Sequence, residues 1–344
     1  MGLEDFGFYL RGRLNSGLAG VLNGLRPASV TPLSLDTLLG LSRPTPLDYV
    51  RLLEGRPNPD RQEVLGRLLA EWRAPFTRLP FATFEGSGEN FVLELGQGPR
   101  TLILIAHHDA VPGSPGANDD GSAVAILLDL LGRLEHDPPR RLRVRLLFTG
   151  GEEIGYLGAR CYVKGALLEG VLGVLSLELC GIGDTLAIWD AVPPSDQAPV
   201  LLAFGGVLEE LGYRRDETYH VVGRIPVFGS DHRAFAAVGL PAFGLTVVPR
   251  SHAEALRQFV LNPFQALVRQ LVRRPPPFDT YHTARDRSTT LEPAALETPI
   301  GWEEPAVCPG VVVARGKRVV LRTLTPADLD HLDQLVGSRR PVKR

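Results

Sequence analysis

The chain has 344 residues, a formal net charge of −2 at pH 7 and 44% hydrophobic residues. This length fits one large domain, or one medium domain with an appendage. The charge is near neutral and lacks long runs of one sign, which argues against a nucleic-acid-binding surface. The three cysteines, Cys161, Cys180 and Cys308, lie far apart and predict no disulfide framework.

The first residues show no sign of a targeting or membrane segment. Glu4, Asp5, Arg11 and Arg13 interrupt them, and no apolar stretch is long enough for a signal peptide or a membrane span. We therefore expect a cytoplasmic protein without a membrane partner. No sequence pattern indicates the oligomeric state.

Residues 1–45 are rich in Gly, Leu, Ser and Pro and have poor periodicity, which predicts a loosely ordered lead-in with a short helix near 14–25. From residue 46 the pattern changes, and RPNPDRQEVLGRLLAEWRA predicts a helix. Asn58 is its expected cap and Pro59 its first helical residue. Its expected apolar face consists of Val64, Leu65, Leu68, Leu69 and Trp72.

Apolar strands and helices then alternate along the chain. The strands are expected at 91–95, 101–106, 141–148, 173–179, 219–222 and 241–248. The helices are expected at 121–134, 155–168, 195–212 and 230–239. This alternation predicts an α/β fold of three layers, αβα, with a mostly parallel central sheet.

The alternation is interrupted near the C-terminus. Residues 250–277 predict an insertion with a helix near 263–272. Residues 314–338 predict a small strand–helix tail. This tail resembles the opening strand and helix of GNAT acetyltransferases but is too short for their activity, and packing on the main domain explains it equally well. We expect a lead-in at 1–45, a main domain at 46–298, and a linker and tail of uncertain role at 299–344.

Potential metal ligands recur where strands meet loops. His107 follows the strand TLILIA, and Asp119 lies in the turn PGANDDGSA. Glu153 follows a third strand in GGEEIG, and Glu178 lies near the end of GVLSLEL. Ligands gather outside the carboxyl ends of parallel strands, so we expect these side chains to converge. His282, in TYHTARD, is the candidate for a second nitrogen ligand.

Each candidate also has a structural explanation when it is taken alone. Helix capping is the favoured interpretation for Asp120 and a plausible one for Asn118. An ion pair with an arginine would explain a buried Glu178. Glu152 and Glu153 would repel each other in a cleft unless a cation or a proton were present. A division of roles resolves this conflict, with Glu153 binding metal and Glu152 free to act as a general base.

Two histidines and three carboxylates suit two zinc ions, with Asp119 as the bridging ligand. Manganese or cobalt would bind the same set. Asp109 lies two residues after His107 and is expected to hold the far nitrogen of its ring. The neighbouring His108 should point elsewhere. The pattern therefore predicts a hydrolytic metalloenzyme.

In this order the motifs AHHD, PGANDDGSA, GGEEIGYLGA, SLELCG, SDHRAF and YHTARD resemble the co-catalytic zinc aminopeptidases, metallopeptidase family 28, over about residues 46–296. The resemblance implies a zinc-exopeptidase, phosphorylase/hydrolase-like fold and a peptide or N-terminal amino-acid substrate. It implies one metal held by His107, Asp119 and Glu178, and another held by Asp119, Glu153 and His282.

The resemblance also makes Glu152 the general base and Asp109 the residue that orients a ligand. It places Asp231 and His232 close to the site, without a ligand role. The family usually has aspartate where this chain has Glu178, so the preference for a metal could differ. The insertion at 250–277 is a second departure, and the short helix after His282 is a third.

Two other functions compete with an aminopeptidase. Glutaminyl cyclases catalyse an aminoacyl transfer on the same fold with one zinc ion. A binding protein on an inactive peptidase fold is the other alternative, although such proteins normally lack ligands or the base. All candidate residues are present in this chain, which favours the peptidase.

Overall fold

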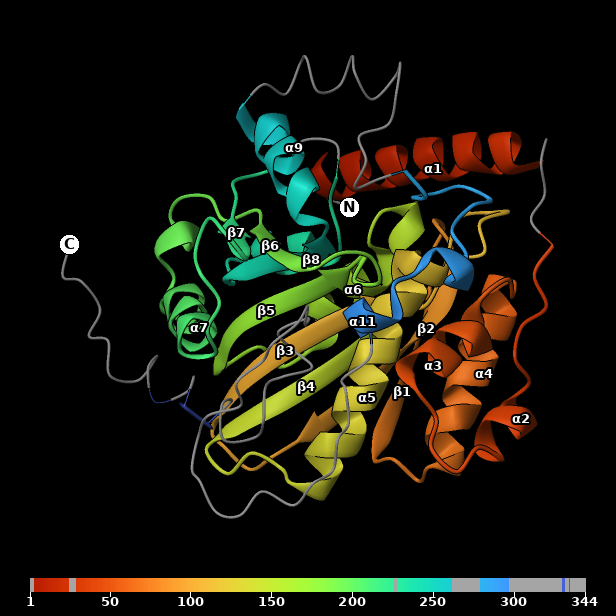
Figure 1. Ribbon diagram of the computed structural model, residues 1–344, viewed down its shortest axis with the longest axis horizontal. Helices are drawn as coiled ribbons and strands as arrows, with labels where there is room; N and C mark the ends of the chain where they lie inside the picture. The colour runs from red at the N-terminus through yellow and green to blue at the C-terminus, as the bar shows by residue number, and fades with distance from the viewer. Residues whose placement is uncertain are drawn as a thin grey trace.

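One eight-stranded sheet runs through the computed structural model, which describes residues 3–24, 29–225, 228–261 and 279–296 with residues 330, 331 and 334 (Figure 1). The strands are β1 (Phe76–Ala82), β2 (Ser87–Leu95), β3 (Arg100–His107), β4 (Leu142–Thr149), β5 (Val171–Glu178), β6 (Thr185–Trp189), β7 (Tyr219–Val221) and β8 (Ala242–Val248). Their order across the sheet is β1-β2-β4-β3-β5-β8-β6-β7.

The centre of the sheet is parallel. Strands β4, β3, β5 and β8 are consecutive parallel neighbours, and β6 pairs with β7 in the same way. The pairs β1–β2, β2–β4 and β6–β8 are antiparallel. The expected α/β fold with a mostly parallel central sheet is confirmed. The antiparallel strands β1 and β6 were not predicted from the sequence.

Helices cover both faces of the sheet. One face packs against α2 (Leu35–Leu39), α3 (Pro46–Leu53), α4 (Asn58–Glu71), α5 (Ser122–His136), α7 (Pro199–Glu210) and α11 (Pro293–Leu296). The other face packs against α6 (Leu157–Gly165) and α8 (His232–Ala236). Successive residues of β3 point to opposite faces, so Leu104 joins the first layer and Ile105 the second. This alternation produces the three expected layers.

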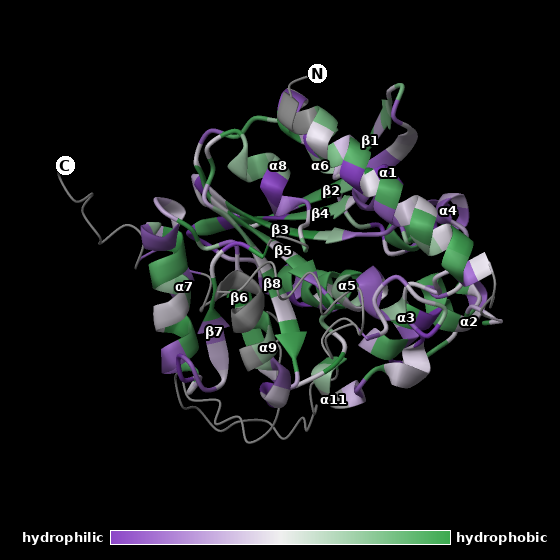
Figure 2. Cartoon of the chain, turned by 90° about the horizontal axis from the view of Figure 1, so that it is seen from above, coloured by the Kyte–Doolittle hydropathy of each residue, from purple (hydrophilic) through white to green (hydrophobic). Residues whose placement is uncertain are grey.

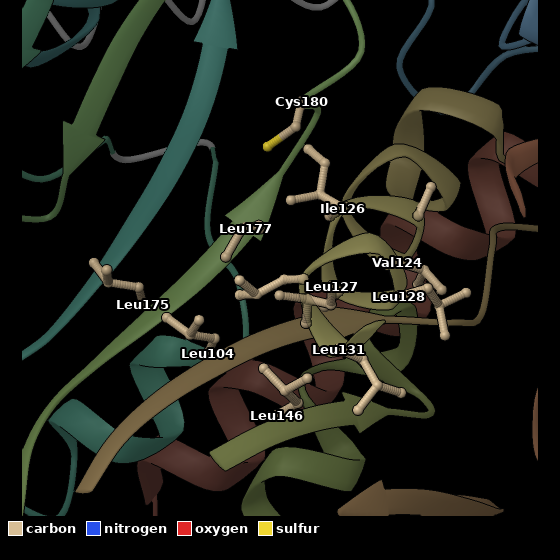
Figure 3. Close-up of a cluster of buried hydrophobic side chains, with 14 of the residues drawn as sticks. Leu104, Val124, Ile126, Leu127, Leu128, Leu131, Leu146, Leu175, Leu177 and Cys180 are labelled. Carbon is tan, nitrogen blue, oxygen red and sulfur yellow. The ribbon is translucent and has the colours of Figure 1, made fainter. Parts of the chain in front are cut away.

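Helix α5 forms the centre of the larger core. Figure 3 shows its Leu127 and Leu131 directed at Leu104, Leu146 and Leu175 of the sheet. All of these side chains are buried. Truncating one such leucine to alanine costs about 2–5 kcal/mol in a packed core. Packing of this strength fixes the N-terminal end of α5, and with it the preceding turn, at one edge of the sheet.

The N-terminal segment differs from the expectation. Instead of a loosely ordered lead-in with a helix near 14–25, it contains the 22-residue helix α1 (Leu3–Gly24). The reason is tertiary: α1 is seated through small residues such as Gly12, which lies directly against Gly155. The apolar residues that do recur at helical spacing, such as Leu10, Leu14 and Leu18, lie on the exposed face of α1.

The expected cap of α4 is also corrected. Asn58 makes no capping hydrogen bond. Its side chain instead donates to the carbonyl of Ala110 at 3.0 Å and accepts the N–H of Ala110 at 2.9 Å. A long-range pair of hydrogen bonds therefore replaces the local one, and it ties α4 to the loop that follows β3.

Several expectations fall on residues outside the described part of the chain. They are the helix near 263–272 and almost all of the tail at 299–344. The described part of the insertion contains α9 (Arg250–Leu261). The division into a lead-in, a main domain and a tail remains a prediction. Among the described residues, no helix has the length and apolar character that crossing a membrane requires.

Candidate metal centre

Three neighbouring strands deliver the candidate residues to one edge of the sheet. His107 ends β3, Glu178 ends β5, and Thr149 ends β4 just before the segment GGEEIG. In the parallel pairing of β3 with β4, His107 lies opposite Thr149. Parallel strands present their carboxyl ends at the same edge, so the topology itself brings these residues together.

The carboxylate of Asp119 lies between two histidine rings. Its Oδ1 is 3.2 Å from Nε2 of His107, and its Oδ2 is 3.3 Å from Nε2 of His282. Glu153 lies 2.9 Å from the His282 Nε2, and Glu178 lies 3.7 Å from the His107 Nε2. All five side chains are buried. The structure thus gathers every residue that the sequence indicated as a ligand.

Asp109 holds the catalytic candidates in place. Its carboxylate accepts the backbone N–H groups of Glu152 and Glu153 at 3.0 and 3.2 Å. It also lies 3.5 Å from Nδ1 of His107, whose ring is 3.0 Å from the Asp109 carbonyl oxygen. The carboxylate of Glu152 ends 3.9 Å from the His107 Nε2. His108 turns away, as expected, and its ring contacts the carbonyl of Glu89.

Glycines around the paired glutamates are required by the backbone. Gly151 has φ 71° and Gly155 has φ 97°, and both values fall in the left-handed region that glycine tolerates best. Between them, Glu152 to Ile154 form one 3₁₀ turn. This turn places both carboxylates at the end of β4. The GGEEIG motif therefore reflects backbone geometry as well as chemistry.

Two residues that the sequence did not single out brace the loops. Asp286 accepts the N–H groups of Asn118 and Asp119 at 2.7 and 3.1 Å. Arg61, on α4, is fully buried and donates only to backbone carbonyls. Those acceptors belong to His108 at 2.5 Å, Leu53 at 3.2 Å, Pro115 at 3.1 Å and Gly116 at 3.2 Å.

Asp120 is a correction, because we expected it to cap a helix. It makes no cap, and its Oδ2 accepts the backbone N–H of His107 at 3.2 Å. Asp120, His107 and Glu178 each offer a possible ligand atom within 4.8 Å of the others. No local pattern indicated this, because with Asp119 assigned to the metals one carboxylate was still left for the cap.

The SDH motif lies beside the cluster but divides between two environments. Asp231 is hydrogen-bonded to Thr149 at the end of β4, and Ser230 is hydrogen-bonded to Glu178. His232 instead joins a separate buried group, with its Nε2 3.1 Å from Asp190. Burial raises the pKa of Asp231 to about 7, and the charges of Asp109 and Glu178 add to this rise.

The electrostatics of the cluster favour a bound cation. Burial raises the pKa of Glu152 and that of Glu153 well above their usual range, and neighbouring carboxylates contribute further. Burial opposes the charged form of His107, but Glu178, Asp109 and Asp119 outweigh it and raise the pKa of the ring. A divalent cation would relieve the repulsion among these acids.

The donor atoms also fit zinc. Nε2 of His107, Oε1 of Glu153 and Oδ1 of Asp120 are buried without a hydrogen-bond partner. Buried polar atoms in proteins are normally paired, and coordination to a metal is one way to satisfy them. Imidazole nitrogen and carboxylate oxygen are ordinary zinc ligands. The residues present therefore suit the metal that the sequence indicated.

Nitrogen and carboxylate donors thus gather at the carboxyl edge of this three-layer fold and form a candidate metal centre. The family follows from the sequence: residues 90–299 match peptidase family M28, and the chain belongs to that family. The predicted family is confirmed.

Named relatives agree with this assignment. The chain is 30% identical over 166 residues to the probable lipoprotein aminopeptidase LpqL of Mycobacterium tuberculosis, which is 44% of this chain and 32% of that protein. It is 37% identical over 106 residues to the vacuolar membrane protease of Candida albicans, which is 31% of this chain and 12% of that protein. The chain thus spans a third or less of the length of these relatives.

A solved structure supports the fold. The glutaminyl cyclase of Porphyromonas gingivalis superposes with a TM-score of 0.55 at 16% identity. The superposition covers 73% of this chain and 92% of that one. At this identity the likeness bears on the architecture alone.

Proposed function

We propose that the chain is a zinc-dependent aminopeptidase that hydrolyses the N-terminal peptide bond of its substrate with two metal ions per chain. The observation that carries this proposal is the position of Asp119, whose two oxygens face the rings of His107 and His282. A carboxylate with one oxygen directed at each of two nitrogen ligands has the arrangement that a bridging ligand needs.

In this proposal each metal has its own ligands and shares Asp119. His107 and Glu178 would hold one ion, and Glu153 and His282 would hold the other. Bound zinc would polarise the scissile carbonyl group and lower the pKa of a water molecule. Manganese or cobalt remain possible occupants of the same donors. Two relatives are named aminopeptidases, LpqL of M. tuberculosis and YwaD of Bacillus subtilis, and this supports cleavage at the N-terminal end of the substrate.

Glu152 is the proposed general base. It is buried beside the cluster, and its backbone N–H is held by Asp109. Glu152 takes a proton from the attacking water and later delivers it to the amine that leaves. Asp109 keeps the backbone of Glu152 and the ring of His107 in position, and it takes no part in bond making. The raised pKa of Glu152 in the metal-free cluster suits a group that both accepts and donates protons.

One experiment tests this function directly. The purified chain is loaded with zinc, the metal is counted by mass spectrometry, and peptides with free and acetylated N-termini are supplied. We expect two ions per chain and release of the N-terminal amino acid from the free peptide only. Cleavage of the acetylated peptide at an internal bond would contradict an aminopeptidase.

A glutaminyl cyclase is the second candidate. The P. gingivalis enzyme shares this architecture, so the fold is compatible with either reaction. A peptide that begins with glutamine distinguishes the two activities. An aminopeptidase releases glutamine, whereas a cyclase releases ammonia and leaves a pyroglutamyl peptide. An inactive binding protein would do neither, but the complete set of buried donors argues against it.

The cytoplasmic location remains a prediction from the sequence. The relatives named above include a lipoprotein and a membrane protease, so they do not support it. The absence of nucleic-acid and membrane partners likewise stays a prediction.

A further inference from the structure

Helix α1 lies over the candidate catalytic site. A cavity of about 20 Å³ separates it from the cluster. Phe8, Arg11 and Asn15 of α1 line one side of this cavity, and Glu152, Glu153 and His282 belong to its other lining residues. That volume holds about one water molecule. Pockets that bind small molecules measure about 300–1,000 Å³, so a peptide needs more room than the described position of α1 leaves.

The helix backbone makes direct contact with the turn that carries the glutamates. A side chain added at Gly12 would overlap the backbone of Ile154 and Gly155, and one added at Gly155 would overlap the backbone of Phe8. The ring of Phe8 also meets the ring of Tyr156, with centroids 5.1 Å apart. The space between α1 and the residues that follow Glu153 is therefore closed.

The far end of α1 is fastened by one side chain. Nδ2 of Asn23 donates to the carbonyls of Pro112 and His282, at 3.0 and 3.3 Å. Its Oδ1 accepts the N–H of Ala284 at 3.1 Å. These bonds connect α1 to the loop after β3 and to the loop that carries His282. Both loops border the metal centre, so α1 spans the site between two points of contact and leaves only a narrow, partly open pocket.

Helix α1 buries its small residues and exposes most of its large apolar ones, which is the reverse of an ordinary surface helix. Helices usually bury their large apolar side chains. Here the docked face contains Gly12, Ser16, Ala19 and Asn23. Phe8 is half-buried against Tyr156, but most of the other large apolar residues are 47–69% exposed: Phe6, Leu10, Leu14, Leu18, Val21 and Leu22. Figure 1 shows α1 along one edge of the molecule, and Figure 2, seen from above, shows it running across the molecule. A small-residue face buries little apolar area, so the contact is weak for a helix of this length.

We propose that α1 is a lid, which closes the active site in the described position and must move away before a substrate can bind. The pocket under α1 is too small for a peptide, so the helix must move before a substrate can bind. The weak contact between α1 and the rest of the protein makes this movement possible. The proposal rests on the proposed peptidase function for the identity of the substrate, but the movement itself does not depend on it.

A reversible disulfide tests the lid. A Cβ placed at Gly20 lies 3.3 Å from the Cβ of Pro112, close to the separation of about 3.5–4.5 Å that a disulfide needs. The double variant Gly20→Cys with Pro112→Cys should therefore lock α1 when it is oxidised. The matched control is Gly17→Cys with Pro112→Cys, because Gly17 faces open space. The reductant is a phosphine, which binds zinc weakly compared with a dithiol.

Two quantities are measured in the oxidised and reduced zinc-loaded proteins. One is the hydrolysis of a tetrapeptide, and the other is the rate at which a bulky chelator removes zinc. We expect oxidation of the Gly20 pair to lower both at least tenfold, reduction to restore both, and the Gly17 pair to change neither. Equal zinc loss in the oxidised and reduced Gly20 pair would overturn the lid.

The zinc measurement separates this proposal from the proposed function. If no form cleaves any peptide but oxidation still slows zinc loss, the lid stands and the peptidase assignment falls. If hydrolysis occurs at the same rate in the locked and unlocked forms, the assignment stands and the lid falls. The variant Gly12→Val gives an independent check, since its side chain should displace α1 and speed zinc loss several-fold. Unchanged zinc loss in that variant also counts against the lid.

Discussion

The carboxylate of Asp286 accepts the backbone N–H of Asp119 at 3.1 Å, across 167 positions of sequence. Its other oxygen accepts the N–H of Asn118 at 2.7 Å. Together these bonds fix the turn that aims Asp119 at the two histidine rings. Asp286 is fully buried, and burial together with the charge of Asp119 raises its pKa to about 7.

Asp286→Ala should weaken metal binding without removing a ligand. Groups that orient a ligand typically contribute about 10–100-fold in metal affinity, and we expect a loss of that size. Competition with a chromogenic chelator measures it. The control is Asp129→Asn, a half-buried carboxylate on α5 away from the site. Unchanged zinc affinity in Asp286→Ala would show that the turn needs no such brace.

Glu152→Gln should bind zinc almost normally and lose nearly all turnover. The amide keeps the size of the side chain but cannot accept the proton of the attacking water. Loss of a general base costs about 10²–10⁴-fold in rate. Steady-state hydrolysis and metal analysis of the same preparation give both quantities. Activity close to that of the native chain would remove Glu152 from the mechanism.

Asp119→Ala and Glu178→Ala should differ in the number of ions that remain. Under the proposed assignment Asp119 serves both metals, whereas Glu178 serves one. We therefore expect no tightly bound zinc in the first variant and one ion per chain in the second. Mass spectrometry under native conditions counts them. Two tightly held ions in Asp119→Ala would disprove the bridge.

Arg61→Lys should destabilise the fold although the charge is kept. A lysine has three donors on one nitrogen, and it cannot reach the four carbonyls that the guanidinium binds. Hydrogen bonds to charged groups contribute about 1.5–3 kcal/mol each, so we expect a loss of about 3 kcal/mol in urea unfolding. Arg67→Lys, at an exposed position of the same helix, is the control and should leave the midpoint unchanged.

Asp190→Asn should be strongly destabilising at neutral pH and less so in acid. Burial raises the pKa of Asp190, but the hydrogen bonds and charges of His232 and Arg233 lower it below the ordinary value. The stability it contributes is present at neutral pH and declines as the pH falls below about 4, the value in an unfolded chain. Breaking a buried pair costs about 3–5 kcal/mol.

Thermal unfolding from pH 8 to pH 3 tests this dependence. The gap between the native chain and Asp190→Asn should stay constant down to about pH 5 and narrow below about pH 4. A gap that widens in acid would show that the pKa shift has the opposite sign.

The predictable part of this protein is the part that depends on periodicity and strand ends. The run TLILIA has the apolar character of a buried parallel strand, and β3 follows it to His107. Because parallel strands end at a common edge, His107, Glu153 and Glu178 were expected to converge. His282 was expected only because the site lacked a second nitrogen and because its motif resembles the family.

The unpredicted part depends on contacts between distant segments. Asn58 satisfies a local capping rule, but its side chain pairs with Ala110. An arginine on a helix is usually exposed to solvent, yet Arg61 is fully buried. The requirement for glycine at position 12 becomes evident only from its contact with Gly155 in the folded structure. None of these partners is visible in a local window of sequence.

Arg61 has one more consequence, for the engineering of this protein. The guanidinium binds backbone carbonyl oxygens, which every amino acid supplies, but a Cβ added at Gly116 would lie 2.7 Å from its Nη1. A designer who varies these segments should therefore keep Gly116, whereas the bonds to the carbonyls of residues 53, 108 and 115 do not depend on residue type.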